Sequence, residues 1–338
     1  MSKILCWITQ RNEEILQIGE ELKAMGHETR VFFADDYYQT CSYFGKKLDE
    51  WGWKRWRQAY LRQKREMFEG LREAFAPDII LFVNFSPIIT SWENLRRLSG
   101  EHGLRFWYVD RIAGWKEAEG LVPFRPMVYD KESMEYLTGL GIRAEYCPVG
   151  YNQVYRIPPK EEKDYDIAFV GLPYKNRLTL LETLAESAQE KGWRLGVFGP
   201  FYETKYFWKG YFFRSKYPML FRYLGNRPLA PARVASVYAG SRICLNIHEK
   251  GSLGVNPRTF AIMATGAMEL MDERRDYDIV RPGVDAAVFR NEEDMLAKVA
   301  YYLEHPKERE IVARSGYERV LGVRSMRTAL QRVLEAGK

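Results

Sequence analysis

Residues 244–266 read CLNIHEKGSLGVNPRTFAIMATG, which places a glycine-containing loop between an apolar strand and the start of a helix. The apolar run at 242–247 predicts a buried strand, and Asn256-Pro257 marks the first turn of a helix that ends near Gly266. Free amides at such a start attract an anion, and an ordinary strand-to-helix connection would give the same pattern. The residues expected to bind a phosphate here are Gly254, Val255, Asn256 and Arg258.

Strand and helix patterns alternate through both halves of the chain. A strand at 4–9, a helix at 13–25 and a strand at 29–33 open the first half, and a strand at 166–170 with a helix at 178–191 opens the second. This alternation is typical of parallel sheets covered by helices, and 338 residues suit two domains. The first strand lacks a following GxGxxG, and no GxxxxGK[ST], GxSxG or HExxH occurs, so the commonest nucleotide and hydrolase motifs are excluded.

Several motifs of the second half resemble a known family. They are YDIAFVG at 165–171, NPRTF at 256–260, PGVDAAVF at 282–289 and YYLEHPKERE at 301–310, followed by ARSGYERVL. These motifs resemble the C-terminal half of GT-B glycosyltransferases, in particular the spore-maturation group of bacterial glycosyltransferase-like proteins, which are relatives of the retaining family four. The resemblance covers about residues 165–334, and CPVGYN resembles the linker between the two GT-B domains.

The resemblance implies an α/β fold of GT-B type, with two Rossmann-like domains that face each other across a cleft. Residues 1–150 would form the acceptor-side domain, residues 151–322 the nucleotide-sugar donor domain, and residues 323–338 a helix that packs back on the first domain. The implied activity is transfer of a sugar from a nucleotide-diphosphate donor to an unknown acceptor, with retention of configuration. The implied reaction needs no metal and no cofactor, because basic side chains and helix-start amides take the place of the metal.

One position departs from the family pattern. Retaining family-four enzymes usually carry a glutamate just inside the helix at 257–266, where it binds the donor ribose, and here the position holds Ala261. Ribose recognition would then come from Glu249, from Glu269 or from backbone carbonyls. The departure also leaves two alternatives open, a non-catalytic protein that binds a nucleotide sugar or glycan in surface-layer assembly, and an epimerase-like enzyme acting on nucleotide sugars.

Ligands of open α/β sheets bind beyond the carboxyl ends of the strands. After the strand at 166–170, Gly171, Lys175 and Arg177 are candidate donor contacts. For Lys175 and Arg177 we expect a cationic clamp on the donor diphosphate, although a solvated helix start would look the same. After the strand at 242–247, His248 is a candidate catalytic residue or a structural hydrogen-bonding histidine. Glu249 follows it as a candidate nucleotide contact.

In the first half, Asp110 ends the strand RFWYV, where GT-B proteins present groups to the acceptor. A carboxylate there could orient or deprotonate an acceptor hydroxyl, or it could cap the next segment. Asn84 and Ser86 follow the preceding strand and have a weaker case for the same role.

Composition limits the remaining possibilities. The net charge of +6 favours an anionic partner, but no nucleic-acid-binding motif is present, and nucleic acid is excluded. No apolar run is long enough to span a membrane, the N-terminus does not read as a signal peptide, and the four cysteines lie far apart. These features predict a cytoplasmic protein with reduced thiols.

Two segments combine aromatic and basic residues. The stretch 51–68, WGWKRWRQAYLRQKREMF, is best explained as a helix with a packed side and a solvated basic side. The stretch 201–225, FYETKYFWKGYFFRSKYPMLFRYLG, fits a peripheral contact with the inner membrane face, a platform for a lipid-linked or sugar acceptor, or a dimer contact. A packed excursion of the second domain is the remaining explanation.

Overall fold

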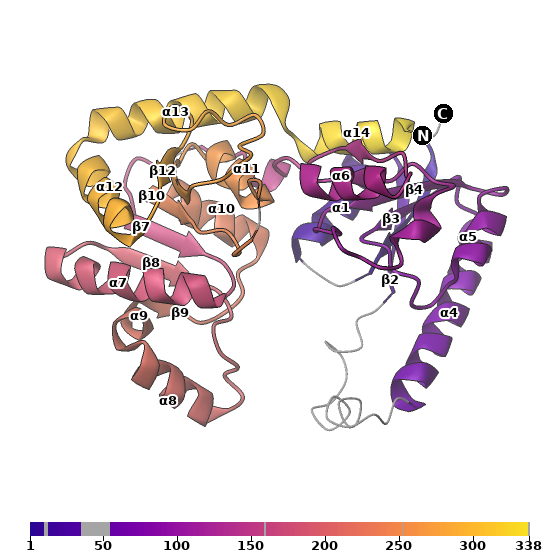
Figure 1. The fold of residues 1–338 in the computed structure, drawn as a ribbon, viewed down its shortest axis with the longest axis horizontal. Helices are drawn as coiled ribbons and strands as arrows, with labels where there is room; N and C mark the ends of the chain where they lie inside the picture. Colours follow the sequence, from indigo (N-terminus) through magenta and orange to yellow (C-terminus); the bar gives the residue numbers. More distant parts are fainter. Residues whose placement is uncertain (10–12, 35–54, 159, 252, 337–338) are drawn as a thin grey trace. The chain divides into compact units, whose positions relative to one another are not determined.

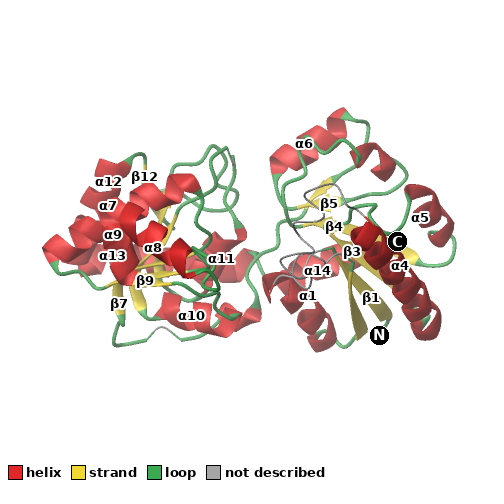
Figure 2. Ribbon diagram, turned by 90° about the horizontal axis from the view of Figure 1, so that it is seen from below, coloured by secondary structure: helices red, strands yellow, loops and turns green. Residues whose placement is uncertain are grey.

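The computed structural model describes residues 1–9, 13–34, 55–158, 160–251 and 253–336, and the chain forms two compact units. One unit consists of Met1–Val149 together with Met326–Lys338, and the other is Gly150–Ser325 (Figure 1). These divisions fall close to those expected after residues 150 and 322. Each unit is a parallel sheet with helices on both faces, as the colouring of Figure 2 shows, which confirms the expected Rossmann-like α/β architecture.

The N-terminal unit is built on a six-stranded sheet in the order β2-β1-β3-β4-β5-β6, with every neighbouring pair parallel. Its strands are β1 (Lys3–Ile8), β2 (Glu28–Phe33), β3 (Ile79–Val83), β4 (Gly103–Tyr108), β5 (Met127–Val128) and β6 (Glu145–Tyr146). Its helices are α1 (Glu13–Ala24), α4 (Arg55–Phe75), α5 (Trp92–Leu98), η1 (Ala118–Leu121), α6 (Lys131–Gly139) and α14 (Met326–Glu335).

The two faces of this sheet bury different side chains. On one face Trp7 packs against aromatic rings, among them Phe68 of α4 at a centroid distance of 4.7 Å. On the other face Ile4 packs with residues of α1 and α14, including the fully buried Leu330. The C-terminal helix therefore completes the core of the N-terminal unit, and an ion pair between Arg327 and Glu21 at 2.6 Å joins α14 to α1.

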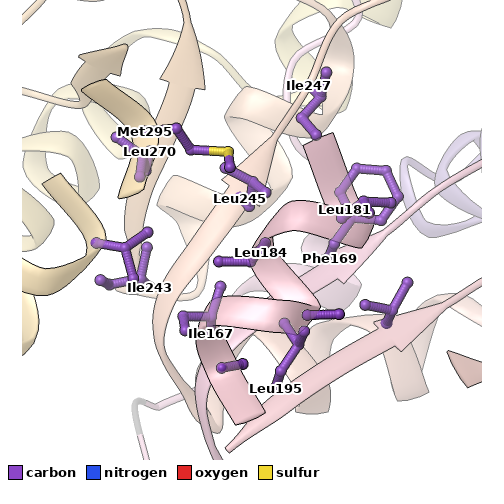
Figure 3. Close-up of a cluster of buried hydrophobic side chains, with 14 of the residues drawn as sticks. Ile167, Phe169, Leu181, Leu184, Leu195, Ile243, Leu245, Ile247, Leu270 and Met295 are labelled. Atoms are coloured by element: carbon purple, nitrogen blue, oxygen red, sulfur yellow. The ribbon is translucent and has the colours of Figure 1, made fainter. Parts of the chain in front are cut away.

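The C-terminal unit is built on a second parallel sheet, in the order β12-β11-β10-β7-β8-β9. Its strands are β7 (Tyr165–Val170), β8 (Leu195–Phe198), β9 (Leu224–Gly225), β10 (Ser241–Asn246), β11 (Met268–Asp272) and β12 (Ala287–Phe289). Its helices are η2 (Gln153–Tyr155), α7 (Lys175–Lys191), α8 (Phe207–Lys216), α9 (Pro218–Tyr223), α10 (Pro231–Ala239), α11 (Pro257–Ala264), α12 (Glu292–Glu304) and α13 (Pro306–Val323). Figure 3 shows part of its core, where Ile167, Leu181 and Leu245 bring β7, α7 and β10 together.

Strand order creates a switch point in each sheet. In the C-terminal unit β8 and β9 continue outward on one side of β7, and β10 then returns to its other side. The connections that leave β7 and β10 therefore diverge, and ligands of open α/β sheets bind in the crevice that such a divergence leaves. In the N-terminal unit the same reversal separates β1 from β3.

The structure refines several expectations about local structure. The stretch 201–225 contains two helices, α8 and α9, that the periodicity did not predict. In the basic stretch 51–68 the helix is seen from Arg55, and the residues before it lie outside the described part. Within the described residues, no helix combines the length and apolarity needed to cross a membrane. Cys6, Cys147 and Cys244 are buried, and Cys41 lies outside the described residues.

Candidate functional site: a pair of arginines beyond the second sheet

The loops that follow β7 and β10 are tied together by side chains at the start of α7. Asn176 donates from Nδ2 to the carbonyl oxygen of His248 at 2.9 Å. Arg177 donates from Nε to the carbonyl oxygen of Ile247 at 2.8 Å and from Nη1 to that of Leu172 at 3.0 Å. These bonds hold the two loops at the switch point in a fixed relation, as a binding site requires.

Two guanidinium groups meet at the buried ring of Phe169. The Cζ atom of Arg177 lies 5.8 Å from the ring centroid and that of Arg258 lies 5.5 Å from it. Burial and, after it, the positive charge of Arg258 lower the pKa of Arg177 to about 10, so Arg177 stays charged at neutral pH. Among the described residues, no carboxylate lies within 4.0 Å of either guanidinium. The site therefore carries two adjacent positive charges, and an anion would compensate them.

A buried polar chain holds Arg258 in place. Its Nη1 donates to Oδ1 of Asn246 at 3.0 Å, and Nδ2 of Asn246 donates to Oε1 of Glu269 at 2.7 Å. Thr259 adds a second bond to Oε1, from its hydroxyl at 2.9 Å, while Oε2 of Glu269 has no hydrogen-bond partner among the described residues. Burial raises the pKa of Glu269 to about 7. The carboxyl group is thus committed to positioning and is not available to a ligand.

Glycines bring three backbone segments close together beside these arginines. A Cβ at Gly171 would lie 2.8 Å from Nη2 of Arg258, so a side chain there would displace the guanidinium. Gly199 follows β8 with φ of +146°, and a Cβ on it would lie 2.0 Å from the carbonyl oxygen of Gly171. Gly171 in turn donates its N–H to Phe198 at 2.9 Å. The expected contact of Gly171 with the donor stays a prediction, while its close approach to Arg258 is a feature of the structure.

His248 has a structural position that does not suit the catalytic role considered for it. The residue is 1% exposed, its Nδ1 lies 2.6 Å from Oδ1 of Asp272, and its Nε2 accepts the N–H of Asn256 at 3.2 Å. A neutral ring that carries its proton on Nδ1 satisfies both bonds. Burial lowers the pKa of His248, with the Asp272 contact opposing the shift, which favours that neutral form. We therefore interpret His248 as the residue that ties the loop to β11.

The start of α11 differs from the expected cradle of free amides. Asn256 uses its N–H for His248, Pro257 has none, and the N–H of Thr259 returns to the carbonyl oxygen of Asn256 at 3.1 Å. Two of the helix-start amides are therefore used within the protein, and the arginine side chains are the candidates that we favour for anion binding. Val255 is nearly buried in the apolar cluster beneath the loop, and Gly254 pairs with Asp276 in an isolated bridge.

Two further donor candidates lie on the surface, and one is buried. Lys175 is the first residue of α7 and is exposed, as expected for either a clamp residue or a solvated helix start. Glu249 is exposed directly after His248. Glu269 is fully buried and hydrogen-bonded, which excludes it as the ribose contact and leaves Glu249 or backbone carbonyls. Ala261 is only 7% exposed and packs in the apolar cluster of α11.

The acceptor-side candidate Asp110 has a defined setting in the N-terminal unit. Asn84 follows β3 with a positive φ of 51° and donates from Nδ2 to Oδ2 of Asp110 at 2.6 Å. Its Oδ1 accepts the N–H groups of Val109 and Asp110 at 2.8 and 3.2 Å. Burial raises the pKa of Asp110, and the Asn84 bond opposes that shift. Asn84, the weaker candidate in the sequence, is thus the residue that orients Asp110.

Sequence reasoning missed several residues that position the loops and side chains of this site. Asn246 and Asp272 are the polar ends of the runs RICLN and MELMD, and a polar residue at the carboxyl end of an apolar strand is a usable signal. Asn176 lies between two residues that were considered, but a single asparagine at a helix start has many explanations. Nothing in the sequence marks Gly199 as part of the site, because its close approach to Gly171 depends on the proximity of β7 and β8.

Comparisons with known proteins also indicate similarity to glycosyltransferases. Residues 177–335 match the model of a family described as glycosyl transferase-like. A search of curated proteins finds no match. Among solved structures, a glycosyltransferase from Rickettsia africae is similar at a TM-score of 0.68 with 11% identity, covering 99% of this chain and 98% of that one.

Two further structures share the fold over their full length. HepE of Anabaena, in complex with UDP and glucose, is similar at a TM-score of 0.66 with 10% identity and 99% coverage of both chains. Sucrose-phosphate synthase from Thermosynechococcus elongatus is similar at a TM-score of 0.65 with 14% identity and 100% coverage of both. The GT-B fold and the resemblance to GT-B glycosyltransferases are confirmed. The narrower spore-maturation group stays a prediction.

Proposed function

From the GT-B fold and the glycosyl transferase-like match of its C-terminal unit, we propose that this chain transfers a sugar from a nucleotide-diphosphate donor to an acceptor hydroxyl, with retention of configuration. The observation that carries the proposal is the pair Arg177 and Arg258 at the switch point between β7 and β10, where no carboxylate of the described residues lies within 4.0 Å of either guanidinium. The HepE complex with UDP and glucose supports the choice of a nucleoside diphosphate as ligand.

In the proposed reaction the bond between the sugar C1 and the diphosphate oxygen breaks, and the acceptor oxygen forms a new bond to C1. Negative charge grows on the departing nucleoside diphosphate, and Arg177 and Arg258 stabilise it by charge-assisted hydrogen bonds. Lys175, exposed at the start of α7, can add a third cation. We assign Asp110 to orient the acceptor hydroxyl and accept its proton, because Asn84 holds its carboxylate beyond the end of β4.

The first test is thermal unfolding with UDP and, separately, with uridine at the same concentration. A ligand that binds only the folded state raises the melting temperature by mass action, and we expect UDP to do so and uridine not to. Guanosine, thymidine and adenosine diphosphates with their nucleosides extend the comparison to other bases. Equal protection by each diphosphate and its nucleoside, or no protection by any, would contradict a diphosphate site.

Product analysis then separates transfer from its alternatives. Transfer gives a new glycoside whose anomeric configuration, read by NMR, tests retention. An epimerase-like enzyme gives a new nucleotide sugar, and a protein that only binds gives no product. The binding-only alternative is favoured by one observation, the buried apolar setting of Ala261 where family-four enzymes usually carry a glutamate.

A further inference from the structure

Helix α8 exposes a row of aromatic side chains at the edge of the C-terminal unit. Phe207 is 85% exposed, Tyr211 71%, Phe212 64% and Trp208 45%. The same helix has no fully buried residue, and Figure 1 shows it beyond α9, away from the sheet of its own unit. Exposed aromatic residues that are contiguous on a surface mark an interaction site, because burying them from water is favourable.

The order of residues around the helix separates these rings from the packed side. At about 100° per residue, Phe207, Tyr211, Trp208 and Phe212 span an arc of roughly 140°. Phe213 points the other way and packs against Tyr202 at a ring-centroid distance of 5.4 Å. The exposed cations Arg214 and Lys216 fall on the two borders of the aromatic arc, one on each side. An aromatic arc with cations along both borders is typical of helices that lie in a membrane interface.

The segment that carries α8 is firmly attached to the sheet. Glu182 of α7 accepts the N–H groups of Met219 and Leu220 at 3.0 and 2.8 Å, which caps the start of α9. At the other end of the segment Asn226 accepts the N–H groups of Phe201 and Tyr202 at 2.7 and 3.1 Å. The outer face of α8 is therefore presented by a braced scaffold, and the packing of the unit does not need that face.

We propose that the outer face of α8 docks on an anionic membrane surface. The aromatic rings would enter the headgroup region, where Trp, Tyr and Phe side chains are favoured, and the basic residues would contact anionic lipid headgroups. Residues 201–225 contain five basic residues and one acidic residue, a composition that complements a negative surface. A second copy of the chain fits less well, because a two-fold contact would place the same cations against each other.

The experiment is vesicle co-sedimentation of the full chain with phosphatidylcholine alone and with phosphatidylcholine containing phosphatidylglycerol. We expect binding to the anionic vesicles that weakens as salt rises, and little binding to the neutral ones. The variant Phe207→Ser/Phe212→Ser should reduce anionic binding by about tenfold or more, and Arg214→Gln/Lys216→Gln should reduce it and flatten the salt dependence. The matched controls are Ile311→Ser, which removes a side chain that is 67% exposed on α13, and Arg314→Gln on the same helix.

UDP affinity and melting temperature are measured on every variant. Neither should change, because the exposed face of α8 contributes no buried residue to the unit and contains neither arginine of the pair. Equal binding of the α8 variants and the wild type to anionic vesicles overturns the proposal, as does absence of wild-type binding. A change in sedimentation-derived mass in the α8 variants without a change in vesicle binding would assign the face to a second copy instead. If the wild type binds anionic vesicles but does not bind UDP, the proposed function is contradicted and the proposed docking surface is still supported.

Discussion

The guanidinium of Arg258 donates a 3.0 Å hydrogen bond to the side-chain oxygen of Asn246, so the last residue of β10 sets the position of a cation at the start of α11. Asn246 has no exposed surface, and its side-chain amide donates a hydrogen bond to the buried carboxyl group of Glu269. An exposed arginine loses side-chain entropy when it binds a phosphate, and an arginine that is already oriented loses less. The relationship explains how a half-buried cation can be ready for a ligand.

Replacement of Arg258 by alanine should weaken UDP binding by at least about tenfold, the scale of one lost charge-assisted hydrogen bond at roughly 1.5 to 3 kcal/mol. Calorimetric titration measures the change. Arg314→Ala removes an exposed cation of the same unit and should leave the affinity unaltered. Arg177→Ala should weaken binding to a similar degree and should also lower stability, since Arg177 bonds two carbonyl oxygens. Wild-type affinity in Arg258→Ala would remove this residue from the site.

The role of Asn246 as a positioning residue makes a sharper prediction. Asn246→Ala should lower UDP affinity in the presence of Arg258, and it should have little further effect when combined with Arg258→Ala, because the two act as one unit. The double-mutant cycle on the dissociation constants gives the coupling energy, expected at about 1 kcal/mol or more. Additive losses would show that Asn246 acts on the pocket by another route.

Glu269 makes stability depend on pH. Its pKa is raised to about 7 by burial, above its value in the unfolded chain, so between pH 4.5 and 7 the folded state holds a proton that the unfolded state has lost. Unfolding free energy should therefore fall as pH rises through this window, by about 3 kcal/mol, and level off above it. Glu269→Gln should remove this part of the dependence, while Glu318→Gln on the surface should not. Urea unfolding at several pH values measures both, and parallel profiles for Glu269→Gln and wild type would contradict the assignment.

Much of the fold can be predicted from the sequence, because its strands are short apolar runs between helical patterns. The strands expected at 166–170 and 242–247 are such runs, and the structure places them within a residue or two. The helices of 201–225 were not predicted, because aromatic residues occur on all their sides. Their support comes from Glu182 and Asn226, which are distant in the sequence.

The candidate site was predictable in place but not in detail. The rule that ligands bind beyond strand ends identified Arg177, Arg258 and His248, and all three lie at the switch point. Which of them is free to meet a ligand depends on partners from other strands. His248 is occupied by Asp272 of β11, and Arg258 is oriented by Asn246, and neither pairing leaves a pattern in one sequence.

Gly199 should tolerate no side chain. Gly199→Ala places a Cβ 2.0 Å from the carbonyl oxygen of Gly171, and the backbone of both loops would have to move. Gly26 also has a positive φ, of +87°, but nothing lies within 4 Å of its would-be Cβ, so Gly26→Ala reports the backbone strain alone. We expect Gly199→Ala to cost at least about 2 kcal/mol more in unfolding free energy than Gly26→Ala and to weaken UDP binding. Equal costs in urea unfolding would show that the contact relaxes without consequence.

Ala261 tests whether the donor nucleotide lies beside α11. Ala261→Glu puts a carboxyl group at a position that is 7% exposed within an apolar cluster, and we expect a loss of about 1 to 3 kcal/mol of stability because the charge loses water. If the ribose lies against this turn, the new carboxylate also changes UDP affinity, either by accepting its hydroxyls or by crowding it. Ala261→Leu is the control, since it adds bulk without an acceptor. Calorimetric titration of UDP into folded Ala261→Glu decides the matter, and an affinity indistinguishable from wild type would falsify the placement of the donor pocket at this helix.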